Sequence, residues 1–273
     1  MQRTLYESLA YKLNTGFLGT AILNQTLTEN GLDDEAYTLL LQRNDPSWLY
    51  SIDQGATTIW ERWNSYTVAN GYGPVSMNSF NHYAYGIIAE WMFRHMAGIA
   101  PDETQPGFRH FTLQPHPDTR RTLRYQQRRI TFVEADFASD YGSIKAEWQC
   151  DGSKEMTYRV TIPAGTTATL RLPISDGFYI YESGTLAENA EGVQYIGTAD
   201  GYATYEVGSG SYLFSISSDS PDGISGIKNE KSNDGVWYDL GGRKLPLTAL
   251  PQRGSREGAN LLVTKDRKIL KYN

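Results

Sequence analysis

The chain has 273 residues, 40% of them hydrophobic, and a formal charge of −6 because 25 Lys and Arg face 31 Asp and Glu. This composition is typical of a globular protein of one or two domains, and it argues against collagen-like, disordered, membrane-inserted and general nucleic-acid-binding classes. The single cysteine cannot close an internal disulfide, and no Cys/His pair has the spacing of zinc ligands, so we expect neither a disulfide framework nor a metal site.

The first hundred or so residues predict helices. Leu5, Leu9 and Leu13 recur at a four-residue step, and Gly16 interrupts the pattern. A second helix is expected over 17–29, where an Asn-Gly pair supplies the usual C-terminal stop.

A third helix is expected to begin with three acidic residues, which face the positive end of the helix dipole, and to run from Asp33 to Arg43. The fourth has an apolar stripe at helical spacing that stops at Gly98. The stripe consists of Phe80, Ala84, Ile87, Ile88, Trp91 and Met92. Successive helices with short connections predict helical hairpins, packed as a bundle or as part of a helical toroid.

After Pro101 the hydrophobic period changes from 3.6 to 2. Apolar and polar residues alternate over 144–150 and 156–162, and the turn signal Asp151-Gly152 joins the two runs. Further short strands are expected at 168–172, 178–181, 202–207 and 212–216. This regular spacing predicts an antiparallel β-sandwich from about 108 to 218.

A polar segment rich in Ser, Asp, Pro and Gly follows the sandwich and predicts a linker. Residues 228–273 carry ten Lys or Arg and five Asp or Glu, a net charge of +5, and strands at 236–240 and 243–245 with a final pair around Lys265-Asp266 predict a small β-module. We therefore divide the chain into a helical part (1–104), a β-sandwich (105–218), a linker (219–232) and a β tail module (233–273).

One carboxylate, Glu61, lies between Trp60 and Trp63 in the loop-rich stretch 55–63. A glycosidase needs a carboxylate to activate water and a flat apolar wall for the sugar. On residue types alone, the commoner interpretation is that Glu61 is solvated or paired with Arg62 while the indoles pack in the core.

His82 follows Asn81 where the fourth helix is expected to open. On a helical wheel it points roughly 200° from Phe80, away from the apolar stripe. A position in the first turn would help keep the imidazole neutral, able to donate a hydrogen bond to a sugar hydroxyl. The alternative is an exposed histidine beside an Asn cap.

Several motifs occur in a fixed order between residues 14 and 173. They are Thr15-Gly16-Phe17-Leu18-Gly19-Thr20, Asn30-Gly31 with the helix 33–42, Pro46-Ser47-Trp48, 55–63, 79–86 with Glu90-Trp91, Gly98-Ile99, Pro106-Gly107-Phe108-Arg109-His110-Phe111, 141–144 with Trp148, and Ile162-Pro163-Ala164 with 166–169. In this set the chain resembles the bacterial α-L-rhamnosidases of glycoside hydrolase family 78.

The resemblance implies an (α/α)6 toroid, of which this chain would hold the last helices, followed by the family's C-terminal β-sandwich. It implies that Glu61 is the general base, that His82 and its neighbour Asn81 line the rhamnose pocket, and that Trp60 and Trp63 lie in or next to it. The implied reaction releases terminal α-L-rhamnose from a rhamnose-containing oligosaccharide or glycoside by inversion, without a metal or organic cofactor.

An inverting glycosidase also needs a general acid. The family's acid lies upstream, and nothing in residues 1–60 resembles its segment: Asp33, Asp34 and Glu35 belong to a helix start, and Asp53 lies in the approach to the motif. We therefore expect this chain to be an inactive C-terminal part that requires the upstream part of the same catalytic domain. We also expect apolar faces where the missing helices would pack.

Two alternatives remain open: a non-catalytic carbohydrate-binding or accessory fragment, and another (α/α)6 glycosidase.

The first residues lack the apolar core of a secretory signal. A polysaccharide-degrading context in a bacterium nevertheless implies a periplasmic, cell-surface or secreted protein. The tail also resembles the C-terminal β-modules of secreted bacterial proteins, although a plain accessory module fits it equally well.

Overall fold

The computed structural model describes residues 12–124 and 127–219 with their side chains, and the backbone of four short strands between residues 237 and 271. The chain divides into two compact units, Met1–Ile224 and Ser225–Asn273. The helix predicted around Leu5 and Leu9, and the predicted linker after residue 219, lie outside the described residues.

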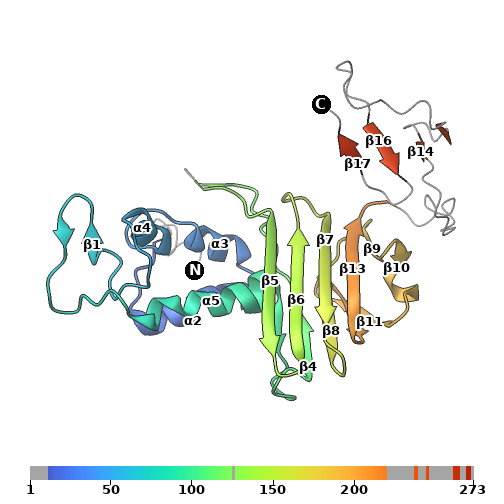
Figure 1. The fold of residues 1–273 in the computed structure, drawn as a ribbon, viewed down its shortest axis with the longest axis horizontal. Coiled ribbons are helices and arrows are strands. Elements are labelled where there is room, and N and C mark those ends of the chain that lie inside the picture. Colours follow the sequence, from blue (N-terminus) through green and yellow to red (C-terminus); the bar gives the residue numbers. More distant parts are fainter. Residues whose placement is uncertain are drawn as a thin grey trace. The chain divides into compact units, whose positions relative to one another are not determined.

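The first unit opens with helices α2 (Phe17–Glu29) and α3 (Asp33–Leu40), which pack against each other (Figure 1). The predicted span and C-terminal stop of α2 are confirmed, and Gly31 has the positive φ, +71°, that follows a helix end. Helix α3 ends at Leu40, before the expected Arg43. The side-chain oxygen of Gln42 accepts hydrogen bonds from the next two backbone N–H groups, which favours a turn there.

A short helix, α4 (Trp48–Asp53), was not predicted from the sequence. Its N-cap is Ser47, whose hydroxyl accepts a hydrogen bond from the Tyr50 N–H at 3.1 Å. Six residues are too few to display a helical period, so only the cap could have indicated it.

The last helical run is continuous and consists of a 3₁₀ segment η1 (Tyr83–Ile87), α5 (Ile88–Trp91) and a π-helical segment η2 (Met92–Ala97). It ends at Gly98 as predicted. The expected start at residues 78–82 is wrong, so Phe80 is not part of the apolar stripe and His82 is not in the first turn. His82 instead has extended backbone and caps the helix, because its Nδ1 accepts the Ala84 N–H.

Two sheets form the predicted sandwich beside the helices (Figure 1). One has six strands in the order β10-β9-β13-β7-β6-β5, the other five in the order β11-β12-β8-β4-β3, and all pairs are antiparallel except β4–β8. The strands are β3 (Ile99–Pro101), β4 (His110–Leu113), β5 (Phe132–Ser139), β6 (Gly142–Gln149), β7 (Met156–Ile162), β8 (Thr167–Pro173), β9 (Tyr179–Glu182), β10 (Thr185–Leu186), β11 (Val193–Ala199), β12 (Tyr202–Val207) and β13 (Gly210–Ser217), with a 3₁₀ turn η3 (Ala187–Asn189) and, among the helices, a hairpin β1 (Tyr66–Thr67) and β2 (Gly71–Tyr72).

The alternation predicted for 144–150 and 156–162 is confirmed, since the apolar members of both runs are buried between the sheets. The sheet begins earlier than expected, because β3 pairs with β4. Strands β5 and β11 were not predicted.

Within the first unit, hydrogen bonds join the helical part to the sandwich. The Trp148 indole N–H donates to the Met96 carbonyl at 2.7 Å, and the Tyr158 hydroxyl donates to the Ala97 carbonyl at 3.0 Å. On the other side of the helices, the Tyr37 hydroxyl donates to the His116 carbonyl at 2.6 Å. The end of the last helix is therefore fixed to the six-stranded sheet.

The second unit is a four-stranded antiparallel sheet in the order β15-β14-β16-β17, which confirms the predicted β tail module. Its strands are β14 (Trp237–Tyr238), β15 (Lys244–Leu245), β16 (Leu261–Thr264) and β17 (Ile269–Lys271). In the described part of the chain, no helix has the length and apolar character needed to cross a bilayer.

Candidate functional site

The loop that carries Glu61 is paired with the segment that precedes η1. The Glu61 N–H donates to the Ser79 carbonyl at 2.9 Å, and the Ser79 N–H donates back to Glu61 Oε2 at 2.8 Å. Further along, the His82 N–H donates to the Ile59 carbonyl at 2.9 Å. These bonds bring the predicted base and the predicted pocket histidine onto two adjacent segments.

Glu61 is half-buried, and its carboxylate is oriented by the Ser79 N–H. Among the described residues, no hydrogen bond engages the other oxygen, Oε1, and no ion pair joins Glu61 to Arg62. The pairing with Arg62 considered from the sequence is therefore not formed. Oε1 is therefore able to accept a hydrogen bond from water or from a ligand.

His82 is held by its backbone and by two aromatic contacts. Its ring stacks on Phe17, with centroids 4.8 Å apart and an interplanar angle of 18°, and lies parallel to Tyr83 at 5.9 Å. Because Nδ1 accepts the Ala84 N–H at 3.3 Å, the neutral ring carries its proton on Nε2. Nε2–H is the group that could donate to a ligand.

The two indoles beside Glu61 pack against other rings. Trp60 is only 7% exposed and meets Phe80 edge to face at 5.3 Å. Trp63 stacks on Tyr85 at 3.8 Å and meets Trp48 edge to face at 5.6 Å. Trp63 therefore packs against the hydrophobic core, as the commoner interpretation of the sequence had it, whereas Trp60 is buried beside Phe80 and outside that core cluster.

Asn81, the fifth predicted site residue, is exposed, and its N–H donates to the Ser79 hydroxyl at 3.2 Å. Ser79 and Phe17 are the residues at this site that the sequence did not nominate. Ser79 contacts Glu61 through backbone atoms, and Phe17 is far from His82 in the chain. Tyr83, which follows His82 in the chain and is 90% exposed, was also not nominated as a site residue.

The carboxylates rejected as general acids from the sequence have structural contacts. Asp33 Oδ2 lies 3.2 Å from His116 Nδ1, Asp53 is paired with Arg43, and Glu35 is buried in α3. Within the residues that the structure describes, no three His, Cys, Asp or Glu side chains gather in a way that could hold a metal ion.

Large apolar side chains are exposed around the loop. Leu18 and Ile22 on α2 are 88% and 64% exposed, and Ile52 on α4 is 58% exposed. The segment that contains β1 and β2 adds Val68, Tyr72, Val75 and Met77. Apolar faces of this kind are predicted from the sequence where further helices of the domain would pack.

Both parts of the first unit match described protein families. Residues 2–96 match the bacterial alpha-L-rhamnosidase 6 hairpin glycosidase domain, and residues 98–187 match the bacterial alpha-L-rhamnosidase C-terminal domain. An alpha-L-rhamnosidase of Streptomyces avermitilis is 39% identical over 217 residues, which are 78% of this chain and 19% of that protein. One from Formosa agariphila is 43% identical over 161 residues, 59% of this chain and 16% of that protein.

Solved structures of alpha-L-rhamnosidases are also similar to this chain. The Streptomyces avermitilis alpha-L-rhamnosidase complexed with L-rhamnose superposes with a TM-score of 0.66 at 38% identity, covering 78% of this chain and 19% of that one. The alpha-L-rhamnosidase from Dictyoglumus thermophilum gives a TM-score of 0.64 at 28% identity, covering 79% and 23%. The chain therefore spans about a fifth of the length of these relatives.

Proposed function

Because this chain belongs to the bacterial α-L-rhamnosidase family, we propose that it supplies the general base, Glu61, for inverting hydrolysis of a glycosidic bond. The single observation that carries this proposal is the carboxylate of Glu61, oriented by Ser79 and free at Oε1. The substrate we propose is a terminal α-L-rhamnose of an oligosaccharide or glycoside. It is supported by the names of the relatives and by the L-rhamnose in the complex from Streptomyces avermitilis.

In this mechanism a water molecule attacks the anomeric carbon through an oxocarbenium-like state. Glu61 Oε1 takes a proton from the water as the new carbon–oxygen bond forms. The bond to the leaving oxygen breaks on the opposite face, and that oxygen takes a proton from a separate acid. The Ser79 N–H keeps Oε2 engaged, so that Oε1 faces the water.

We assign substrate binding to His82, Asn81, Trp60 and Trp63. His82 donates from Nε2–H to a sugar hydroxyl, and the Phe17 stack keeps the ring in that orientation. The indoles form walls whose positions are set by the rings behind them.

The general acid in this proposal lies in the upstream part of the same catalytic domain. The support is that the chain covers only 19% of the Streptomyces relative and that its helices expose apolar side chains such as Leu18 and Ile22. The complete protein would act in the periplasm, at the cell surface or outside a bacterial cell. The reaction as written uses no metal or organic cofactor.

The test is hydrolysis of p-nitrophenyl α-L-rhamnopyranoside by this chain and by the protein extended upstream. We expect turnover only from the extended protein, and β-L-rhamnose as the first sugar formed, observed by NMR. Glu61→Gln in the extended protein should lower kcat by roughly 10²–10⁴-fold.

The matched control is Glu147→Gln, which alters an exposed carboxylate of β6 that is 3.6 Å from Arg159. It should leave turnover unchanged. Unchanged turnover in Glu61→Gln would show that another group is the base. Activity of the short chain alone would show that an acid lies within it, and hydrolysis only of other p-nitrophenyl glycosides would favour another glycosidase.

A second candidate is a non-catalytic carbohydrate-binding fragment. It is favoured by a hollow on the sandwich that shares no residue with the Glu61 loop.

A further inference from the structure

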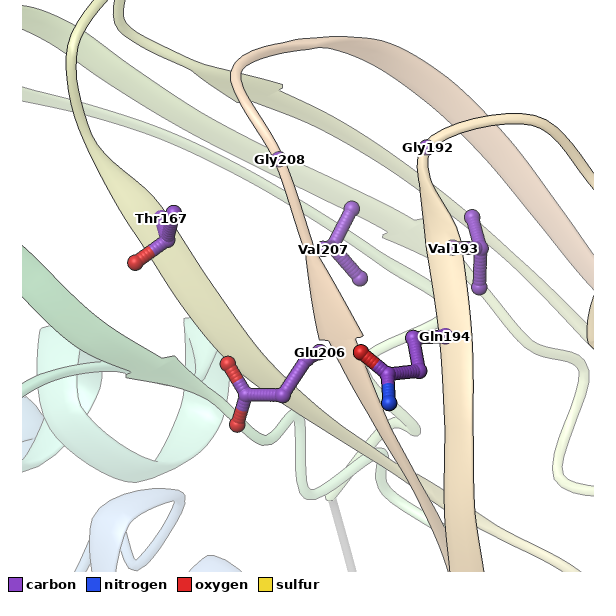
Figure 2. Close-up of a pocket in the computed structure, with 7 residues that line it drawn as sticks. All are labelled: Thr167, Gly192, Val193, Gln194, Glu206, Val207 and Gly208. Carbon is purple, nitrogen blue, oxygen red and sulfur yellow. The ribbon is translucent and has the colours of Figure 1, made fainter.

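A hollow of about 380 Å³ opens on the five-stranded sheet where β8, β12 and β11 lie side by side (Figure 2). Its volume falls in the range of small-molecule sites. It is lined by Thr167, Gly192, Val193, Gln194, Glu206, Val207 and Gly208. None of these residues belongs to the helices, so the hollow is separate from the site of Glu61.

The polar side chains of the hollow lie on the outer face of the sheet. Gln194 is the cross-strand neighbour of Glu206, and Glu206 is the cross-strand neighbour of Thr169. The adjacent positions Val193 and Val207 are buried toward the core. Figure 2 shows the polar side chains of Thr167, Glu206 and Gln194 on three neighbouring strands, together with the side chains of Val193 and Val207.

A chain of hydrogen bonds fixes which atoms of the hollow donate and which accept. A carboxylate only accepts, so the Thr169 hydroxyl donates to Glu206 Oε1 at 2.6 Å. Thr169 Oγ1 therefore accepts from His110 Nε2 at 2.9 Å. His110 Nδ1 is in turn hydrogen-bonded to the Thr167 hydroxyl at 2.8 Å.

The hollow therefore offers a carboxylate oxygen as an acceptor. The Thr167 hydroxyl, which also lines it, is hydrogen-bonded to His110. Among the described residues, no hydrogen bond engages Glu206 Oε2 or the Gln194 amide. The Gln194 amide thus supplies both a donor and an acceptor. The Gly208 N–H donates to the Gly192 carbonyl at 3.1 Å and is not available to a ligand.

A ligand that suits this surface carries hydrogen-bond donors and no negative charge. An anion would be repelled by Glu206, and a divalent cation needs more oxygen ligands than one carboxylate and one amide provide. We propose that the hollow binds one neutral sugar unit of a glycan. Because no aromatic ring lines it, the sugar is held through its hydroxyl groups, and binding is weak for a single unit.

The experiment titrates the ¹⁵N-labelled 273-residue chain with neutral methyl glycosides of L-rhamnose, D-galactose, D-glucose and D-xylose, followed by NMR. We expect at least one of them to shift the Gln194 side-chain amide together with the backbone amides of Gly192 and Gly208. The same shifts should appear in Glu61→Gln, because that residue belongs to the other site.

Glu206→Gln removes the charge-assisted acceptor and should weaken the binding about tenfold. Thr167→Val removes the hydroxyl that lines the hollow and should weaken the binding several-fold. Glu147→Gln, on the other sheet, is the matched control and should bind like the parent. The unperturbed remainder of each spectrum establishes that the variants fold.

The proposal is overturned if none of the four glycosides shifts these amides. It is also overturned if Glu206→Gln binds as tightly as the parent, or if methyl α-D-galacturonate, which carries a negative charge, binds as well as its neutral counterpart. These outcomes do not depend on whether Glu61 is a base.

Discussion

His95, in the last turn of η2, should make the stability of the first unit depend on pH. Its Nε2 is buried without a hydrogen-bond partner among the described residues, and its ring meets His116 edge to face at 5.7 Å. Burial, followed by the charge of His116, lowers the pKa of His95 to about 4, with Arg94 adding to the effect. The carboxylates of Glu29 and Asp33 oppose the shift without reversing it.

The sign follows from comparing the folded and unfolded states. In the unfolded chain the pKa of the imidazole is about 6.5, so on acidification the unfolded state takes up a proton before the folded state does. The stabilising contribution is complete above about pH 6.5 and is lost as the pH falls toward 4. A difference of about 2.5 units at 1.36 kcal/mol each gives about 3 kcal/mol, which we discount to about 2 kcal/mol because the ring retains contact with solvent.

The assay is urea unfolding of the chain at about pH 7 and about pH 4, for the parent and for His95→Gln. Gln does not titrate, so the loss of unfolding free energy on acidification should be about 2 kcal/mol smaller in the variant. Equal pH dependence in His95→Gln and the parent would refute the assignment of this loss to His95.

Three further substitutions test the packing of the first unit. Gly98→Ala should lower the unfolding free energy by more than about 2 kcal/mol in urea, because φ is +87° and the new Cβ would lie 2.4 Å from the backbone carbon of Gln114; a smaller loss would mean that this junction can move. Trp148→Phe removes the donor to the Met96 carbonyl and leaves a cavity. The same urea titration should therefore show that the free energy of unfolding falls by roughly 3 kcal/mol. A loss near zero would contradict the role given to this hydrogen bond. Leu18→Gln, at a side chain 88% exposed, should leave stability within about 0.5 kcal/mol and reduce self-association in analytical ultracentrifugation; unchanged association would show that this face does not contact other copies.

Much of the fold could be predicted because its signals are local. Strands β6 and β7 carry their own apolar alternation, and helix α2 ends at the stop signal Asn30-Gly31. Strand β11 could not be predicted in this way. Most of its residues are exposed and a bulge between Tyr195 and Gly197 breaks its pairing, so no apolar alternation marks it.

In the candidate site, too, the residues that lie in local motifs could be predicted, whereas the contacts that orient them could not. Glu61 and His82 were nominated because they lie in short, ordered motifs, and the structure pairs the segments that carry them. What orients them was not predictable: the Ser79 N–H on the carboxylate is a backbone contact, and the Phe17 ring reaches His82 from another helix. Such contacts depend on tertiary packing, which a motif does not encode.

The sandwich has a direct physical connection to the helix that presents His82. The last carbonyls of a helix have no partner within the helix. Here Trp148 and Tyr158 donate to the carbonyls of Met96 and Ala97, so side chains of the sheet satisfy that end. At the other end the same helical run is capped by His82 itself. Anchoring one end to a rigid sheet restricts the position of the other, and this gives a physical reason for the helical part and the sandwich to occur together in one compact unit.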